Sequence, residues 1–291
     1  MIRSMTGYGA AEGSVAGARV AVELRAVNHR FFSPSLKLPS AFARWEHDVR
    51  EALRRRLGRG HVTLSAHLER AATTAAIDEE RFSAYVGQLR ALQERHALDG
   101  PLDVGTLLRM PDVLSTRSEE ELPTEALAEL LAIVERAADA LLEMRSAEGA
   151  RLAAYLRERL AVIEDAVGRI ATRAPQRVLE HRDRLRQSVQ ELAQGVAVDE
   201  QRLAAEIAIL ADRLDVQEEI ARFHSHFAAF RSALDDAGGE GVGKRLGFLL
   251  QELLREANTT GSKANDPEMT RDVLVVKEEL ERVREQVENL E

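Results

Sequence analysis

The chain has 291 residues, of which 45% are hydrophobic and 31% are charged, and it contains no cysteine. This composition is sufficient for a folded core and excludes a disulfide scaffold, a zinc site with cysteine ligands and a thiol nucleophile. The first 70 residues contain 12 Lys or Arg and 6 Asp or Glu, whereas the remaining residues contain 28 and 43, and the net charge is −9. A basic first quarter can attract phosphate locally although the whole chain is acidic, or it can simply be uneven surface charge.

The sequence contains no sign of membrane insertion. No apolar run is long enough to cross a bilayer, and the first residues, MIRSMTGYGAAEG, lack the apolar segment of a signal peptide. A cytoplasmic protein without a membrane partner is therefore expected.

The first quarter of the chain has the alternation of β-strands. Apolar and polar residues alternate with a period of two over residues 18–26 and 61–69, and residues 36–39 are expected to form a further short strand. Residues 42–57 have helical spacing instead, with Trp45 on the apolar side. A small sheet that packs on one helix is therefore predicted, with the tryptophan in its core.

The remainder of the chain is predicted to be helical. Apolar residues recur at helical spacing over residues 78–97, 124–171, 176–194, 199–214, 220–234, 243–257 and 267–290. Segment 124–171 is predicted as two helices or one kinked helix, and Pro175 is predicted to mark a boundary after it. The apolar seam of the last helix suits packing against a partner helix.

These patterns indicate an α+β protein that is predominantly helical. A small N-terminal β-sheet domain packed on a helix is assigned to residues 1–120. Long antiparallel helices are assigned to residues 121–198, and a C-terminal helical domain to residues 199–291.

Residues 258–265 separate two amphipathic helices with a run of polar groups. The following Asp266-Pro267 is a helix start, with the aspartate as N-cap and the proline in the first turn. A tight turn closed by a glycine is therefore predicted. It either satisfies its own hydroxyl groups or forms a polar pocket in which backbone N–H groups and side chains bind an anion. The candidate phosphate-binding residues of this turn are Asn258, Thr259, Gly261, Ser262 and Lys263.

The helix before this turn carries two carboxylates that can converge. Glu252 and Glu256 are four residues apart and therefore share one face. Oxygen ligands of this kind suit Mg²⁺ or Mn²⁺, and Arg255 could hold a phosphate oxygen beside them. The alternative is a solvated face on which Glu252 pairs with Arg255.

A second polar stripe lies earlier in the chain. Glu219, Arg222 and His226 occupy positions i, i+3 and i+7 of a helical pattern. His226 could act as a general base or a metal ligand near neutral pH, Glu219 could add a carboxylate, and Arg222 could bind phosphate. A surface histidine beside a carboxylate is the plainer interpretation.

Two further clusters are basic. The segment Asn28-His29-Arg30 lies at a strand end before two phenylalanines, where it can pair with phosphate and stack on bases, or simply cover a buried Phe31 or Phe32. An arginine cluster at the end of the N-terminal helix suits phosphate contacts without sequence choice, or it neutralises the helix C-terminus. Its members are Arg54, Arg55, Arg56 and Arg59.

Several of these segments together resemble the YicC/YloC family of bacterial proteins. The matching segments are MIRSMTGYGAAE, ELRAVNHRFF with LKLP, RGHVTLSAHLE, ADRLDVQEEIARFHSHFAAF and GKRLGFLLQELLREANTTGSKAND. Thr260, the second threonine of NTTGSK, stands where the family usually has an aliphatic residue. The resemblance implies a bacterial cytoplasmic protein that cleaves single-stranded RNA with a metal ion and assembles into a ring-like homo-oligomer, a hexamer.

The sequence therefore leads to the hypothesis of a metal-dependent endoribonuclease that contributes to RNA turnover. Glu252, Glu256 and Glu219 would bind Mg²⁺ or Mn²⁺. The residues assigned to catalysis are Glu252, Glu256, His226 and Arg255. The alternative is an oligomeric RNA-binding chaperone or adaptor without its own catalysis. The expected partners are single-stranded RNA, further copies of the chain and other RNA-decay proteins.

Overall fold

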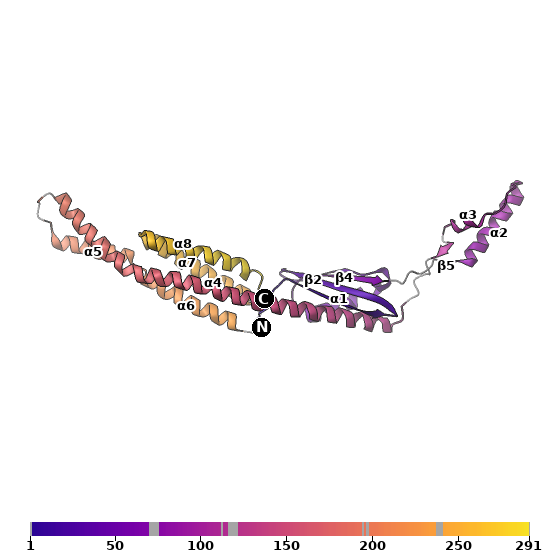
Figure 1. The fold of residues 1–291 in the computed structure, drawn as a ribbon, viewed down its shortest axis with the longest axis horizontal. Helices are drawn as coiled ribbons and strands as arrows, with labels where there is room; N and C mark the ends of the chain where they lie inside the picture. The colour runs from indigo at the N-terminus through magenta and orange to yellow at the C-terminus, as the bar shows by residue number, and fades with distance from the viewer. Residues whose placement is uncertain are drawn as a thin grey trace. The chain divides into compact units, whose positions relative to one another are not determined.

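The structure is a computed structural model that describes residues 2–69, 76–111, 113–115, 122–193, 195, 198–236 and 241–290. The chain forms two compact units, a helical unit of Met1–Gly7 with Leu142–Glu291 and a sheet unit of Tyr8–Leu141 (Figure 1). The predicted fold class, a predominantly helical α+β protein, is confirmed. The three regions assigned from the sequence remain a prediction.

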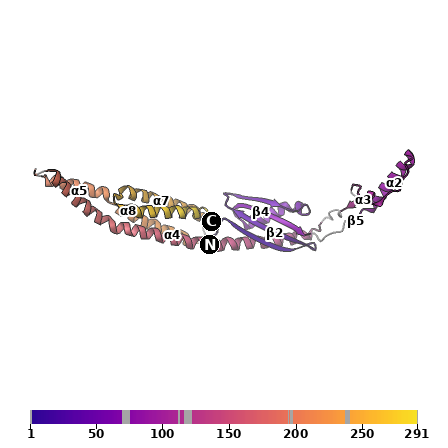
Figure 2. The same ribbon diagram turned by 45° about the horizontal axis from the view of Figure 1, so that its top comes forward.

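The sheet unit is built on four strands in the order β1-β2-β4-β3. Their bounds are Gly7–Val15 for β1, Ala18–Val27 for β2, Phe32–Lys37 for β3 and Gly60–Glu69 for β4. β2 and β4 lie side by side and run antiparallel, whereas β3 runs parallel to β4 at the edge (Figure 2). Ala16 and Gly17 join β1 to β2 with positive φ angles of 48° and 81°, the conformation that a tight hairpin turn requires.

One face of this sheet is covered and the other is exposed. The alternating apolar residues of β2 and β4, Val20, Val22, Leu24, Val62 and Leu64, are fully buried. The 3₁₀ helix η1 (Ser40–Trp45) and helix α1 (Glu46–Arg56) follow β3 and contribute buried Phe42 and Trp45, which confirms the prediction for the tryptophan. Gly9 of β1 lies against α4 (Glu125–Ala193), where a Cβ would approach the carbonyl oxygen of Ala137 to 2.2 Å.

The sheet unit also contains shorter elements. These are β5 (Ala76–Ile77), α2 (Glu79–His96), α3 (Val104–Leu108) and β6 (Leu114–Ser115). β5 and β6 pair antiparallel. The side chains of Asp78 and Asp103 cap α2 and α3 by accepting hydrogen bonds from backbone N–H groups of the first turn.

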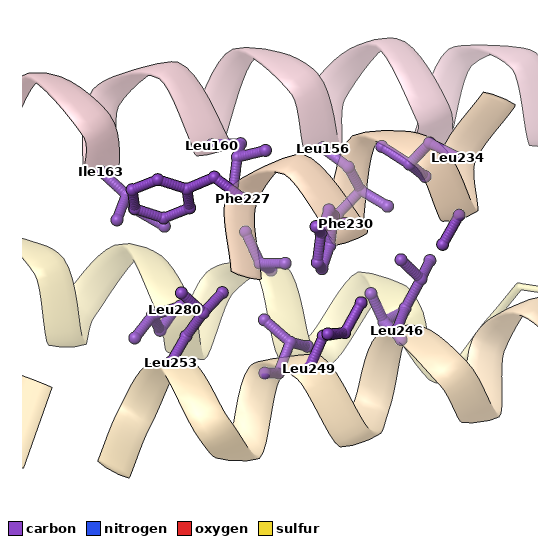
Figure 3. Packing of buried hydrophobic residues seen from close by; sticks show 14 of the residues in the cluster. Leu156, Leu160, Ile163, Phe227, Phe230, Leu234, Leu246, Leu249, Leu253 and Leu280 are labelled. Atoms are coloured by element: carbon purple, nitrogen blue, oxygen red, sulfur yellow. The ribbon is translucent and has the colours of Figure 1, made fainter. Parts of the chain in front are cut away.

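The helical unit has a large hydrophobic core and a smaller cluster around Ile170, Ala264 and Met269. α6 (Gln217–Asp235), α7 (Val242–Ala264) and α8 (Pro267–Val287) pack with α4, and α5 (Glu200–Leu214) precedes them. Leucine, isoleucine and phenylalanine side chains from these helices point toward one another in Figure 3, among them Leu156, Leu160, Ile163, Phe227, Phe230, Leu246, Leu249, Leu253 and Leu280. Burial of this apolar surface is the main favourable term that holds the four helices together.

The first residues of the chain belong to the same unit as the last. Ser4 N donates to the carbonyl oxygen of Arg145 at 2.9 Å, and Met5 N donates to that of Asn289 at 2.8 Å. Gly149 of α4 permits this approach, because a Cβ there would lie 2.3 Å from the carbonyl oxygen of Ile2. The N-terminal segment is therefore fixed against both α4 and the end of the helical bundle.

The predicted boundary at Pro175 is wrong. α4 continues through it from Glu125 to Ala193. A proline removes one intrahelical hydrogen bond, but the flanking turns are held from outside the helix. Arg173 pairs with Asp266 at 2.8 Å, and Arg177 donates to the carbonyl oxygen of Lys263 at 2.6 Å. These tertiary contacts offset the lost bond, so one helix forms where the local signal predicts two.

Among the helices within the described residues, none is both long and apolar enough to cross a membrane.

Candidate metal and phosphate site

Buried charged side chains gather between α6 and α7. Glu219 of α6 and Glu256 of α7 are only 4% and 2% exposed. Lys263 Nζ lies 2.8 Å from Glu219 Oε1, and Arg222 Nη1 lies 3.4 Å from Glu256 Oε1. Each pair joins a residue of α6 to one of α7. We call Glu219, Arg222, Glu256, Thr260 and Lys263 the α6–α7 polar cluster.

Helical periodicity explains why these residues meet. Glu219 and Arg222 stand three apart on α6, as do Thr260 and Lys263 on α7, with Glu256 one turn before them. The core residues of both helices occupy the neighbouring stripes and pack into the bundle. Antiparallel packing of the two apolar stripes therefore brings the two polar stripes together at their common border.

Two buried polar atoms of the cluster lack a hydrogen-bond partner among the described residues. They are Glu219 Oε2 and Thr260 Oγ1. An unsatisfied buried acceptor or donor costs about 1–3 kcal/mol, and buried polar groups in native proteins are nearly always paired. The free carboxylate oxygen therefore points to a role beyond its ion pair with Lys263.

The α6–α7 polar cluster contains two carboxylates and two cations, and Glu218 beside it adds a third carboxylate. Arg222 also pairs with Glu218 on its own helix. The negative charge of Glu218, followed by that of Glu256, raises the pKa of the Arg222 guanidinium, and Glu219 contributes as well. Three carboxylates thus surround one arginine, with Lys263 as the second cation. This surplus of negative charge favours a bound cation.

The predicted turn at residues 258–265 is wrong. α7 continues to Ala264, and the connection to α8 is only Asn265, in the left-handed conformation, followed by Asp266. Gly261 is a helical residue that permits close packing, because a Cβ there would lie 3.2 Å from Val273 Cγ1 of α8. The backbone N–H groups of 259–262 lie inside α7 and do not form an anion pocket.

The hydroxyl groups of this segment bond locally. Thr259 Oγ1 donates to the carbonyl oxygen of Arg255 at 3.1 Å, and Ser262 Oγ donates to that of Thr259 at 2.8 Å. Asn258 is exposed. Of the five candidate phosphate-binding residues of the predicted turn, Lys263 is the one that belongs to the α6–α7 polar cluster. The predicted N-cap role of Asp266 is confirmed.

The remaining predicted catalytic residues lie around the cluster. His226 and Glu252 are half-buried. His226 follows Arg222 by one turn on α6, and Glu252 precedes Glu256 by one turn on α7, so both lie on the same side of the pair of Arg222 and Glu256. Arg255 is exposed. Within the described residues, no group of three or more His, Asp or Glu side chains is arranged to hold a metal ion. The structure therefore places Glu219 and Glu256 in one buried cluster between α6 and α7, with Glu252 one turn before Glu256 on α7.

Sequence reasoning missed the residues that hold the end of α7. Arg177 of α4 is fully buried and donates hydrogen bonds to the carbonyl oxygens of Lys263, Ala264 and Leu214. Burial lowers the pKa of this guanidinium. It satisfies helix-end carbonyls and thereby fixes the backbone of Lys263. No local signal distinguishes Arg177 from the exposed arginines of the same helix.

A second buried link joins α4 to the start of α8. Arg173 donates to Asp266 and to Glu180, and Asp266 also accepts from the backbone N–H groups of Glu268 and Met269. The hydrogen bond from Arg173, together with these backbone donors, lowers the pKa of Asp266 despite its burial. The link fixes the turn that follows Lys263.

The predicted basic residues of the sheet unit form two groups, the arginines at the end of α1 and the segment before β3. Arg56 pairs with Glu135 and Asp139 of α4, so its charge is neutralised. Arg54 Nη1 lies 3.8 Å from Glu51 Oε1, and the Arg54 side chain is 70% exposed. The other members of this cluster, Arg55 and Arg59, lie at the same end of α1, where Arg55 Nε donates to the carbonyl oxygen of Glu51.

The segment before β3 is open to solvent. Asn28, His29 and Arg30 are exposed, and Phe31 is 65% exposed. The interpretation in which Asn28-His29-Arg30 covers a buried Phe31 is therefore wrong. His29 Nδ1 lies 2.9 Å from the carbonyl oxygen of Phe31 and shapes the bend before the strand.

A family model described as the endoribonuclease YicC-like N-terminal region matches residues 2–154, and one described as endoribonuclease YicC-like, C-terminal, matches residues 170–291. The chain belongs to the YicC-like endoribonuclease family. A relative named probable endoribonuclease YicC from Clostridioides difficile (strain 630) is 32% identical over 297 residues. Another with the same name, from Haemophilus influenzae, is 30% identical over 295 residues. Both comparisons cover 100% of each chain.

Family membership confirms the resemblance seen in the sequence. The C-terminal YicC-like region contains the whole α6–α7 polar cluster, and the N-terminal region contains the sheet with its basic residues.

Proposed function

We propose that this YicC-like protein is an endoribonuclease that cleaves single-stranded RNA with a divalent metal ion held at the α6–α7 polar cluster. The family and the names of both relatives support RNA cleavage. The metal assignment depends on one observation, the unpartnered Oε2 of buried Glu219 in a cluster that also contains buried Glu256.

The donor atoms fit Mg²⁺ or Mn²⁺. Glu219 and Glu256 offer carboxylate oxygens, which hard cations prefer. Mg²⁺ commonly binds through one or two carboxylates and completes its shell with water and substrate phosphate. A pair of carboxylates without a third protein ligand is therefore sufficient. A bound ion would polarise the scissile phosphate and lower the pKa of the attacking oxygen.

The two cations are the most exposed side chains of the cluster, so an approaching phosphate would meet them first. The side chains of Arg222 and Lys263 are 50% and 31% exposed, while the carboxylates they pair with are buried behind them. A guanidinium and an ammonium group both bind phosphate oxygens strongly. A phosphate that draws them outward would free oxygens of Glu256 and Glu219 for the metal ion. Binding of substrate and of metal would then support each other.

His226 and Glu252 are the nearest candidates for proton transfer. They stand one turn beyond the cluster on its two helices, and both are half-buried. Histidine is the side chain that most often serves as general acid or base in enzymes. We assign the proton transfer to His226 and metal binding to Glu219 and Glu256.

The test is cleavage of a labelled, unstructured oligoribonucleotide by the purified full chain with Mn²⁺ or with EDTA. Glu219→Gln and Glu256→Gln keep the size of the side chain and are expected to lower the cleavage rate and the affinity for Mn²⁺ at least about tenfold. Glu278→Gln, an exposed carboxylate of α8, is the matched control and should cut at the wild-type rate.

Two results would overturn the proposal. Full cleavage in EDTA would remove the metal ion from the reaction, and wild-type rates in both folded variants would remove these carboxylates. RNA binding without cleavage by highly purified protein would instead favour a chaperone or adaptor.

A further inference from the structure

Exposed aromatic and cationic side chains gather at one end of the uncovered sheet face. Tyr8 of β1 is 40% exposed, Val27 of β2 is 50% exposed, and Phe31 before β3 is 65% exposed. Arg25 and Arg30 lie beside two of these residues and are exposed too. Large apolar side chains are normally found inside a fold, so a group of them beside cations on one surface suggests a binding site.

Strand register places these residues on neighbouring strands. Val27 of β2 is paired with His61 of β4, which is paired in turn with Ser33 of β3. Two residues back along β2, on the same face, Arg25 is paired with Thr63 of β4, and we call each such set of paired residues a row. Because alternate residues of a strand share a face, both rows lie on the side opposite the buried leucines and valines.

Ring and guanidinium contacts connect the rows into one surface. The Arg25 guanidinium lies 5.8 Å from the centre of the Tyr8 ring, and that of Arg30 lies 5.3 Å from the centre of the Phe31 ring. The rings of His29 and His61 are 6.4 Å apart, edge to face. We call Tyr8, Arg25, His29, Arg30, Phe31 and His61 the aromatic platform.

The charge of the sheet face changes along its length. At the far end, Arg19 pairs with Glu12 and Glu69 and is neutralised. At the platform end, Arg25 and Arg30 are exposed, and the carboxylate recorded beside them is Glu23, whose Oε2 lies 3.7 Å from Arg25 Nη2. The platform therefore has a net positive charge, and it complements a polyanion.

We propose that the aromatic platform binds single-stranded RNA by stacking unpaired bases on Tyr8 and Phe31 while Arg25 and Arg30 contact the phosphates; this inference rests on the proposed endoribonuclease function. Exposed rings beside guanidinium groups are the combination with which proteins hold unpaired nucleotides. A duplex hides the faces of its bases, so it cannot use the rings. The platform would thus select single strands in the sheet unit, whereas the α6–α7 polar cluster cuts them in the helical unit.

The test is fluorescence anisotropy of a labelled unstructured oligoribonucleotide with the full chain in EDTA, so that binding is measured without cleavage. Tyr8→Ala and Phe31→Ala are each expected to weaken binding at least about fivefold, the effect of losing one stacked base. Tyr8→Phe and Phe31→Tyr keep a ring and should retain the wild-type affinity. A blunt duplex of the same sequence should bind less tightly and should not distinguish the alanine variants from wild type.

Control variants separate this proposal from the preceding one. Arg19→Gln alters the neutralised end of the same face and Leu98→Ala removes another exposed apolar side chain, so both should bind RNA normally. Wild-type affinity in both platform alanine variants would overturn the platform, even if Glu256→Gln abolishes cleavage and the endoribonuclease proposal stands. Loss of cleavage in Glu256→Gln with loss of binding only in the platform variants would support both.

Discussion

The two units of this protein use charged side chains in opposite ways. In the α6–α7 polar cluster, Glu219 and Glu256 are almost fully buried and each has a cation across the helix interface. On the sheet face, Arg25 and Arg30 are exposed and contact aromatic rings. A buried charge is strongly destabilising unless it is paired, whereas an exposed one is stable in water and remains able to meet a ligand. We therefore propose cleavage in the helical unit and RNA binding in the sheet unit.

The largest expected effect comes from removing the cation of a buried pair. Lys263→Met leaves Glu219 with neither oxygen paired and should lower the free energy of unfolding by about 3 kcal/mol. The double variant Lys263→Met with Glu219→Gln should recover at least half of this loss, because no buried charge is left alone. Urea unfolding of the full chain, followed by circular dichroism, measures both.

The sheet unit provides the matched control for that comparison. Arg25→Gln alters an arginine whose side chain is 71% exposed and should change the free energy of unfolding by no more than about 0.5 kcal/mol. Equal effects of the two substitutions would contradict the contrast between a paired buried charge and an exposed surface charge.

A smaller effect depends on pH and concerns the start of α8. The pKa of Asp266 is lowered in the folded protein, chiefly by its hydrogen bond from Arg173. The ionised form is therefore favoured by folding, and its stabilisation is complete above the ordinary aspartate pKa of about 4 and is lost as pH falls through the lowered value. Asp266→Asn should cost about 2 kcal/mol at pH 7.

Measuring the free energy of unfolding at several pH values tests the predicted direction of this pH dependence. The difference between wild type and Asp266→Asn should shrink between pH 5 and the acid limit of the folded state. A difference that stays constant as the solution is acidified would show that the charge of Asp266 does not stabilise the fold.

The smallest expected effect is a gain in stability and not a loss. Thr260 Oγ1 is buried without a partner among the described residues. Thr260→Val keeps the shape of the side chain and removes the unsatisfied hydroxyl, so the free energy of unfolding should rise by about 1 kcal/mol. A lower stability would show that the hydroxyl group has a partner in solution.

Part of the fold follows from local patterns. The period-two alternation of residues 18–26 and 61–69 predicts β2 and β4, because one face of each strand is buried. β1 gives no such signal, since two of its inward positions are Gly9 and Gly13, which lie against α4. Glycine there serves the close approach of helix and strand, a tertiary requirement that strand patterns do not show.

The candidate site was only partly predictable. The sequence identified Glu219, Arg222 and Glu256 as candidates because their spacing places them on polar stripes, and Lys263 as part of a polar segment between two helices. It could not assign their partners, and it placed Lys263 in a turn because Gly261 resembles a helix stop. The structure shows that Gly261 instead permits α8 to pack closely through Val273.

The sequence by itself determined the periods of β2, β4 and the long helices and the cap at Asp266, because strands, helical stripes and caps depend on residues within a turn or two of one another. Only the tertiary structure decided that α4 continues through Pro175, that Arg177 closes the end of α7, and that Glu219 meets Lys263. Those contacts join residues far apart in the chain, so they form only when the apolar faces of whole helices have packed.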